Sequence, residues 1–185
     1  MSKLSRIEGA TTQLQGDLFE YIVAEAVRGD NGFIDIGRLC KNEDGKYADC
    51  DVMAIKGRSE ITFIECKGYK PYSVVKHEVI KHWIGHQVPV FRKFAKRDYP
   101  NAEINVELWT TGKFSDETRE MLDKYIYAAD INKKYNVRIL EAHNVRQIIR
   151  ATKNDSLIRV FEKHFIDSKM KVSRHRTAPE PTSQA

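Results

Sequence analysis

The sequence contains no run of about 18 apolar residues, the length needed to span a bilayer. Its opening stretch, MSKLSRIEGATTQ, also lacks the apolar core of a secretory signal. From these two absences we expect a cytoplasmic protein with no membrane partner.

Disulfide and zinc patterns are missing as well. The cysteines are Cys40, Cys50 and Cys66. Their number is odd and no two form C-x-x-C, which favours neither a disulfide framework nor a zinc ribbon, and their apolar neighbours predict buried thiols. In HEVIKH, His77 and His82 are one residue too far apart for an H-E-x-x-H motif, and only His82 and His86 could share a helical face.

The sequence does have an ordinary globular composition with one basic segment. Of its 185 residues 41% are hydrophobic and 31% charged, enough for one domain with a substantial core. Residues 67–97 hold eight basic residues and a single acidic one, Glu78, although the whole chain carries only +5. Such a block favours a phosphate-bearing polyanion as partner. After residue 67 its basic members are Lys70, Lys76, Lys81, Arg92, Lys93, Lys96 and Arg97.

The periodicity of apolar residues predicts one α/β domain over residues 1–167. It indicates a helix at 13–27, strands at 33–40, 47–55 and 61–67, and a basic helical region at 73–96, split into two helices near Gly85 and Pro89. A strand at 104–109, a helix at 115–129, a strand at 137–140 and helices at 145–152 and 156–165 follow. This order, α-β-β-β-α-β-α-β-α, predicts a three-layer fold with a central mixed β-sheet flanked by helices. Residues 168–185 are polar and aperiodic, which predicts a disordered tail or a linker.

The second and third predicted strands each carry carboxylates at the end far from the turn that joins them. If residues 57–59 form a three-residue loop, Lys56 faces Glu60 and Asp51 lies opposite Glu65. Opposed like charges destabilise a strand pair. A divalent cation such as Mg²⁺ or Mn²⁺ would offset that cost, because these ions prefer oxygen ligands.

Two further residues belong to this arrangement. Side-chain alternation along the strand puts Lys67 on the same face as Glu65, beside the expected metal. A register shifted by two would favour Asp49 instead of Asp51, so both aspartates stay open as ligands.

These residues together resemble a known superfamily. A strand with Asp, a tight turn and a strand with Glu-x-Lys, all after a helix that carries a glutamate, resemble the PD-(D/E)XK nucleases, most closely the Mrr-type restriction endonuclease and Holliday-junction resolvase branch. GDLFEYIVAEAV is similar to the first helix of that branch, and CDVMAI and FIECKGY to its central hairpin. ELWTTGKFSDETREML and NVRILEAHNVRQII are similar to its second half, so the resemblance covers most of residues 9–152. The proline of the family name is absent, and Cys50 stands in its place.

The resemblance implies a restriction-endonuclease-like fold and an endodeoxyribonuclease that depends on Mg²⁺ or Mn²⁺ and leaves 5′-phosphate and 3′-hydroxyl ends. It implies that Asp51, Glu65 and the main-chain carbonyl of Cys66 bind the metal. Lys67 would position or deprotonate the attacking water, and Glu20 would hold a metal-bound water or a second ion. The seven basic residues given above would bind double-stranded DNA.

Other functions stay open for such a domain. A chain of this fold can bind DNA without cutting it, or cut branched DNA at junctions during repair. It can also be the nuclease part of a larger restriction or anti-phage defence system, with a fused or associated sensor domain and a homodimeric or higher oligomeric state.

Overall fold

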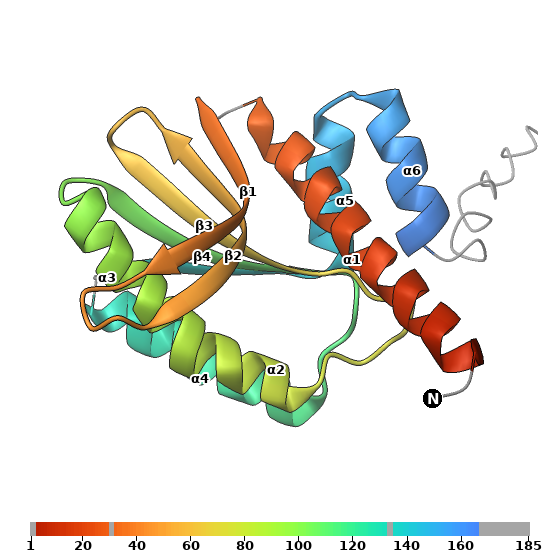
Figure 1. The fold of residues 1–185 in the computed structure, drawn as a ribbon, viewed down its shortest axis with the longest axis horizontal. Helices are drawn as coiled ribbons and strands as arrows, with labels where there is room; N and C mark the ends of the chain where they lie inside the picture. Colours follow the sequence, from red (N-terminus) through yellow and green to blue (C-terminus); the bar gives the residue numbers. More distant parts are fainter. Residues whose placement is uncertain (1–2, 30–31, 133–134, 167–185) are drawn as a thin grey trace, which may run out of the picture.

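A five-stranded β-sheet separates two layers of helices (Figure 1). The computed structural model describes residues 3–29, 32–132 and 135–166. In spatial order the strands are β1 (Phe33–Lys41), β2 (Tyr47–Lys56), β3 (Glu60–Lys67), β4 (Glu103–Thr110) and β5 (Asn136–Leu140). β1, β2 and β3 pair antiparallel, and β3, β4 and β5 pair parallel. The predicted α/β class with a mixed sheet is therefore confirmed.

Each helical layer has its own core against the sheet. One layer contains α1 (Lys3–Arg28), α5 (Ala142–Ala151) and α6 (Asp155–Phe165). The other contains α2 (His77–His82), the π-helical turn η1 (Trp83–Gln87), α3 (Val88–Asp98) and α4 (Asp116–Asn132). Val52 of β2 belongs to the first core and Met53 to the second, while Phe63 of β3 stacks on Phe91 of α3 with ring centroids 5.0 Å apart. Burial on both faces accounts for the nearly continuous apolar runs in β3 and β4.

All five predicted strands are confirmed, each to within one residue at either end. The hairpin register also follows from the three-residue loop, because Lys56 pairs with Glu60. Gly57 has a φ of 61° in that loop, a conformation that favours glycine.

The sequence predicts that the first helix begins at residue 13, but α1 begins at Lys3. The added part, residues 3–12, contains only two large apolar residues, Leu4 and Ile7, which are too few to predict a helix. Where α1 crosses the end of β3, a Cβ placed on Gly68 would lie 2.6 Å from Cβ of Phe19. The helix and the strand end are therefore in main-chain contact, and this contact brings Glu20 of α1 close to Lys67.

The basic helical region is split into two α-helices near Gly85, as the sequence predicts, but the interruption is not a break. The π turn η1, which contains Gly85, joins α2 to α3, so the chain stays helical from His77 to Asp98. Pro89 lies in the first turn of α3, where its missing N–H is tolerated, and the irregularity takes the form of a π turn. The segment begins after residue 73 because Val74 pairs with Lys113 in an isolated parallel bridge.

Two of the remaining helices have side-chain caps at their start. Oγ of Ser115 accepts a hydrogen bond from the N–H of Thr118 (3.3 Å), and Oδ1 of Asn154 accepts one from the N–H of Leu157 (3.1 Å). Across the described ranges, no helix is both long and apolar enough to cross a membrane. The predicted tail, residues 168–185, lies outside the described residues.

Candidate active site

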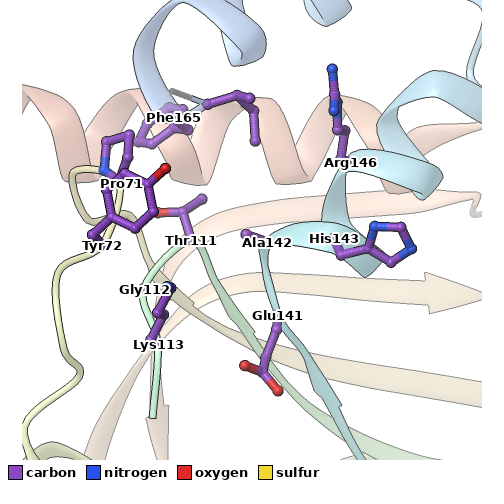
Figure 2. Close-up of a pocket in the computed structure, with 11 residues that line it drawn as sticks. Pro71, Tyr72, Thr111, Gly112, Lys113, Glu141, Ala142, His143, Arg146 and Phe165 are labelled. Atoms are coloured by element: carbon purple, nitrogen blue, oxygen red, sulfur yellow. The ribbon is translucent and has the colours of Figure 1, made fainter. Parts of the chain in front are cut away.

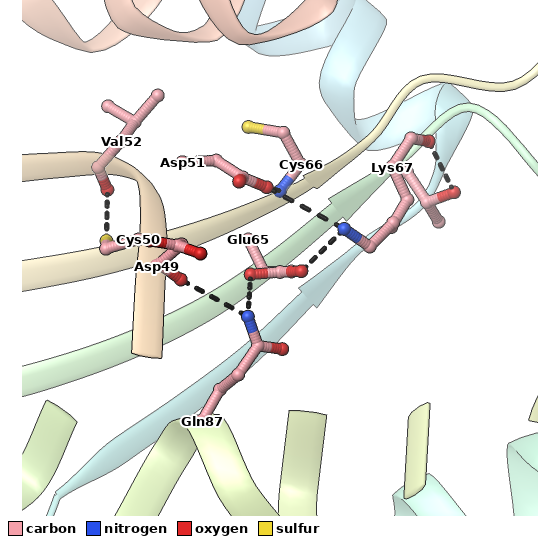
Figure 3. A network of polar contacts seen from close by, with 9 residues as sticks. Asp49, Cys50, Asp51, Val52, Glu65, Cys66, Lys67 and Gln87 are labelled. Carbon is pink, nitrogen blue, oxygen red and sulfur yellow. Dashed lines mark hydrogen bonds and ion pairs between the residues drawn. The ribbon is translucent and has the colours of Figure 1, made fainter. Parts of the chain in front are cut away.

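The sheet loses its regular pairing at the row that holds the predicted acidic residues. The β2–β3 ladder stops at Val52 and Ile64, one residue before Asp51 and Glu65. In the β1–β2 ladder the pair between Gly37 and Asp51 is also missing, and Gly37 has a φ of 68°. β2 changes direction here, so that its first half turns away from β3 (Figure 3).

Three charged side chains meet where β2 and β3 separate (Figure 3). Nζ of Lys67 lies 2.5 Å from Oε1 of Glu65 and 3.8 Å from Oδ2 of Asp51. Oδ2 of Asp51 also accepts a hydrogen bond from the main-chain N–H of Cys66 at 2.7 Å. This bond holds the Asp51 carboxylate against the neighbouring strand. The two acidic residues that the hairpin register predicts to be opposite one another thus share one lysine.

A residue from the helical layer completes the network. Nε2 of Gln87 donates to Oε2 of Glu65 at 2.8 Å and to the main-chain oxygen of Asp49 at 3.2 Å (Figure 3). The carboxylate of Asp49, the alternative ligand, forms no ion pair within the described part of the chain. The geometry therefore favours Asp51 over Asp49 as the partner of Glu65.

Gln87 was not identified from the sequence, although a signal for it was present. It lies seven residues after Ile80 and four before Phe91, both fully buried, so it occupies a polar position on an apolar helical stripe. Its neighbour His86 donates from Nε2 to the main-chain oxygen of Tyr47 at 2.9 Å. Two consecutive residues of η1 thus attach the helical layer to the first half of β2.

The carboxylates of the site are buried and repel one another. The side chain of Glu65 is only 5% exposed. Burial, followed by the charge of Asp51, raises its pKa to about 7, although Lys67 and Gln87 act in the opposite direction. Burial likewise raises the pKa of Asp51. Burial disfavours the ammonium of Lys67, but Glu65 and Asp51 outweigh it and raise the pKa of this lysine.

Glu20 extends the same electrostatic cluster from α1. Burial raises its pKa to about 7, and the next causes are the charges of Asp51 and Asp17. Lys67 lowers the pKa of Glu20 and Glu65 raises it, both as weaker contributions. Three carboxyl groups around one ammonium leave an excess of negative charge that a bound cation would relieve.

The basic residues predicted to contact DNA do not form one patch around this site. All but Arg92 are exposed: Lys70, Lys76, Lys81, Lys93, Lys96 and Arg97. The first three lie on the segment that leaves the site after β3. The last turn of α3 leads instead toward β4, whose first residue pairs with Glu60 beside the hairpin turn. Lys96 and Arg97 therefore lie toward the end of the sheet that carries the β2–β3 turn, and Lys67 lies at the other end.

Three of the seven are engaged by other side chains. Lys93 forms an ion pair with Asp44 in the β1–β2 turn, and Arg97 pairs with the aspartate that follows it. The guanidinium of Arg92 lies 4.0 Å from the ring centroid of Tyr135. Their contact with DNA stays a prediction, and it would require Lys93 and Arg97 to exchange carboxylate partners for phosphates.

The donor atoms of the site suit a hard divalent cation. Carboxylate and carbonyl oxygens are the ligands that Mg²⁺ and Mn²⁺ prefer, and Mg²⁺ usually keeps several waters. Oδ1 of Asp51 accepts no hydrogen bond from the described residues, which leaves it available. Among those residues no group of three or more His, Cys, Asp or Glu side chains is placed to hold a metal ion. Asp51 and Glu65 would therefore need the carbonyl of Cys66, water or phosphate oxygens to complete the coordination.

Comparisons of the chain with protein-family models, with curated proteins and with solved structures find no match. The restriction-endonuclease-like fold and the family resemblance consequently stay predictions.

Proposed function

We propose that this chain is an endonuclease that hydrolyses DNA phosphodiester bonds with the help of Mg²⁺ or Mn²⁺. The observation that carries the proposal is the meeting of Asp51, Glu65 and Lys67 where two strands of the sheet separate. Carboxylates with a surplus of negative charge, beside a fixed ammonium, are what a metal-assisted attack on a phosphate requires.

The chain's own residues would divide the work as follows. Asp51 and Glu65, with the carbonyl of Cys66, would hold the metal, and Glu20 would hold a water next to it. When bound, the cation would supply Lewis-acid stabilisation of the phosphate and a water of lowered pKa. Gln87 would keep Glu65 in its orientation through the 2.8 Å hydrogen bond.

Lys67 would act as a fixed positive charge. Its pKa is raised by Glu65 and Asp51 against the effect of burial, so it stays an ammonium at neutral pH. It can then donate hydrogen bonds to the attacking water or to a phosphate oxygen. A cation held by the two carboxylates would offset part of their charge, and the proton of Lys67 would then be easier to release.

Double-stranded DNA is the proposed substrate. The exposed lysines on the segment that follows β3 would contact phosphates rather than bases, which predicts binding with little sequence preference. A branched-DNA nuclease, or the effector domain of a restriction or anti-phage system, would use the same chemistry.

A DNA-binding module that does not cut is the second candidate, and one observation favours it. Lys67 already contacts both carboxylates and offsets one of their two charges, so the site is partly satisfied without a metal. In a cutting enzyme this contact must yield when the cation binds.

The test is nicking of supercoiled plasmid in Mg²⁺ by the wild type, Lys67→Ala and Lys56→Ala. Lys56, at the hairpin turn and exposed, serves as the matched control. We expect Lys67→Ala to lose about 10²- to 10³-fold in rate while it keeps its circular dichroism and DNA affinity. Lys67→Arg should not restore the rate, since a broad, weakly hydrated guanidinium does not replace a compact ammonium at this position. Equal cutting by wild type and Lys67→Ala would refute the catalytic role.

A further inference from the structure

A cavity lies beside the candidate active site, at the carboxyl ends of β3, β4 and β5. This cavity of about 270 Å³ is lined by residues from the loop after β3, the loop after β4, the start of α5 and the end of α6. Thr111, at its base, donates its main-chain N–H to the carbonyl of Lys67 at 3.2 Å. The crevice outside the carboxyl ends of parallel strands is where α/β proteins most often bind ligands.

The walls of the cavity are held in place without any ligand. Oγ1 of Thr111 bonds both the N–H and the carbonyl of Tyr69, at 2.7 and 2.8 Å. Two main-chain hydrogen bonds of Lys113, to Ser73 and Val75, both 2.8 Å long, further tie the loop after β3 to the loop after β4. Because the lining residues are already ordered, they would lose little conformational entropy when a ligand binds.

One part of the cavity is apolar. Pro71, Tyr72, Ala142, Phe165 and Ile166 contribute to its lining. Tyr72 is about half exposed, and its main chain has a φ of 68°, which a residue with a large side chain rarely adopts. A volume somewhat below the ~300–1,000 Å³ of typical small-molecule sites suits one planar ring system.

The rim of the cavity is positive. Lys113 is exposed and forms no ion pair within the described residues; its Nζ lies 4.7 Å from the ring centroid of Tyr72. Oε1 of Glu162 lies 2.9 Å from Nη2 of Arg146 and 2.5 Å from Nη2 of Arg150, so one carboxylate is paired with two guanidiniums. In Figure 2, Tyr72 and Lys113 lie on one side of the cavity, and Ala142, His143 and Arg146 on the other.

The remaining carboxylate at the rim does not cancel this charge. Glu141 lines the cavity but forms a two-pronged ion pair with Arg119, at 2.7 and 3.1 Å. A ligand would therefore meet an aromatic wall and an excess of positive charge at one opening.

We propose that this cavity binds one nucleotide unit, with the base against Tyr72 and the phosphate at Lys113. The unit can come from an unpaired nucleotide of a DNA strand or from a free mononucleotide. The DNA source rests on the proposed function, since Thr111 couples the cavity to the strand end that carries Lys67. The free-nucleotide source does not.

The first experiment measures calorimetric binding of 2′-deoxyadenosine 5′-phosphate, deoxyadenosine and inorganic phosphate to the full chain in EDTA. Lys113→Ala removes the phosphate contact, and Tyr72→Asn removes the ring while keeping a residue that tolerates positive φ. Lys124→Ala is the control, because Lys124 is an exposed lysine of α4 with its own partner, Glu120. Circular dichroism checks that each variant is folded.

The second experiment measures, by fluorescence anisotropy in EDTA, the affinity for a duplex with one extrahelical adenosine and for the fully paired duplex. Stacking of a base on an aromatic side chain predicts about tenfold tighter binding of the bulged duplex. Tyr72→Asn and Lys113→Ala should both remove that preference, and Lys124→Ala should keep it.

The results separate the two sources and the two proposals. A preference for bulged DNA that is lost in both cavity variants supports the cavity with DNA as the source. Mononucleotide binding that is lost in both variants supports it with a free nucleotide as the source, even if no plasmid is nicked. If neither arm shows binding that depends on Tyr72 and Lys113, the proposal is overturned, even if the chain nicks plasmid in Mg²⁺.

Discussion

Replacing Glu65 by glutamine should make the metal-free protein more stable while it abolishes the proposed cleavage. In the folded chain Glu65 holds its proton up to about pH 7, whereas the unfolded chain releases it near the ordinary value of 4.5. Between these two values the folded state binds more protons than the unfolded state. The free energy of unfolding therefore falls as the pH rises through this window.

The size of the effect follows from that difference. A carboxyl whose pKa lies about 2.5 above its ordinary value costs about 3 kcal/mol to ionise in the folded chain, an upper bound for the gain from Glu65→Gln at pH 8. At pH 5 the same cost is below about 1 kcal/mol. For a chain of this length, about 3 kcal/mol corresponds to a rise of about 6–12 °C in Tm.

The assay is urea and thermal denaturation in EDTA at pH 5 and pH 8. Glu117→Gln is the control, since the side chain of Glu117 is 81% exposed and its loss should change stability by less than about 0.5 kcal/mol. Added Mg²⁺ should stabilise the wild type and leave Glu65→Gln nearly unchanged, because the ligand is lost. A Glu65→Gln variant less stable than the wild type at pH 8 would show that the pair with Lys67 outweighs burial, and would refute the reasoning.

Two further predictions concern the contact of α1 with the sheet and the exposed lysines. Gly68→Ala should destabilise the chain by about 1–3 kcal/mol in urea denaturation, because the new Cβ would press on Phe19. Gly16→Ala is the control and should instead stabilise α1, because Gly16 has open space around it. Equal effects of the two substitutions would place the strain elsewhere. Replacing Lys76 and Lys81 together by alanine should reduce the slope of log binding constant against log salt concentration by about 0.9 per lysine. The slope is measured by fluorescence anisotropy of labelled DNA from low to high salt. An unchanged slope would place the DNA on another surface.

The sequence was sufficient for the sheet because its strands are bounded by strong turn residues. Gly57 follows Lys56 directly, and the three-residue loop then determines every β2–β3 pair down to Val52 and Ile64. The meeting of Asp51 with Glu65 was predictable for the same reason.

The end of that ladder was not predictable. Whether Asp51 continues the ladder depends on the bend of β2, on the positive φ of Gly37 and on the attachment of η1 to the first half of β2. These are contacts between segments far apart in sequence, and no local pattern reports them. Asp51 instead bonds the N–H of Cys66, which a regular register does not anticipate.

The basic segment shows another limit of sequence reasoning. Counting charges treats Lys70, Arg92 and Arg97 alike. In the structure, however, Lys70 is exposed near the site, Arg92 stacks on Tyr135, and Arg97 lies toward the opposite end of the sheet. A continuous helix of this length carries its later turns away from the site, so charge density along the chain overstates charge density in space.

The π turn η1 determines what the loss of one residue from this segment would cost. A π turn contains one residue more than the α-helical turn it replaces, and it absorbs that residue locally. Deleting one residue from 83–87 would therefore restore a regular helix and leave α2 and α3 nearly in their present orientation, whereas the same deletion inside α3 would rotate all later residues by about 100°. The stack of Phe91 on Phe63 would survive the deletion in the turn, but the hydrogen bonds of His86 and Gln87 to β2 and Glu65 would be lost. The extra residue thus serves the site rather than the core.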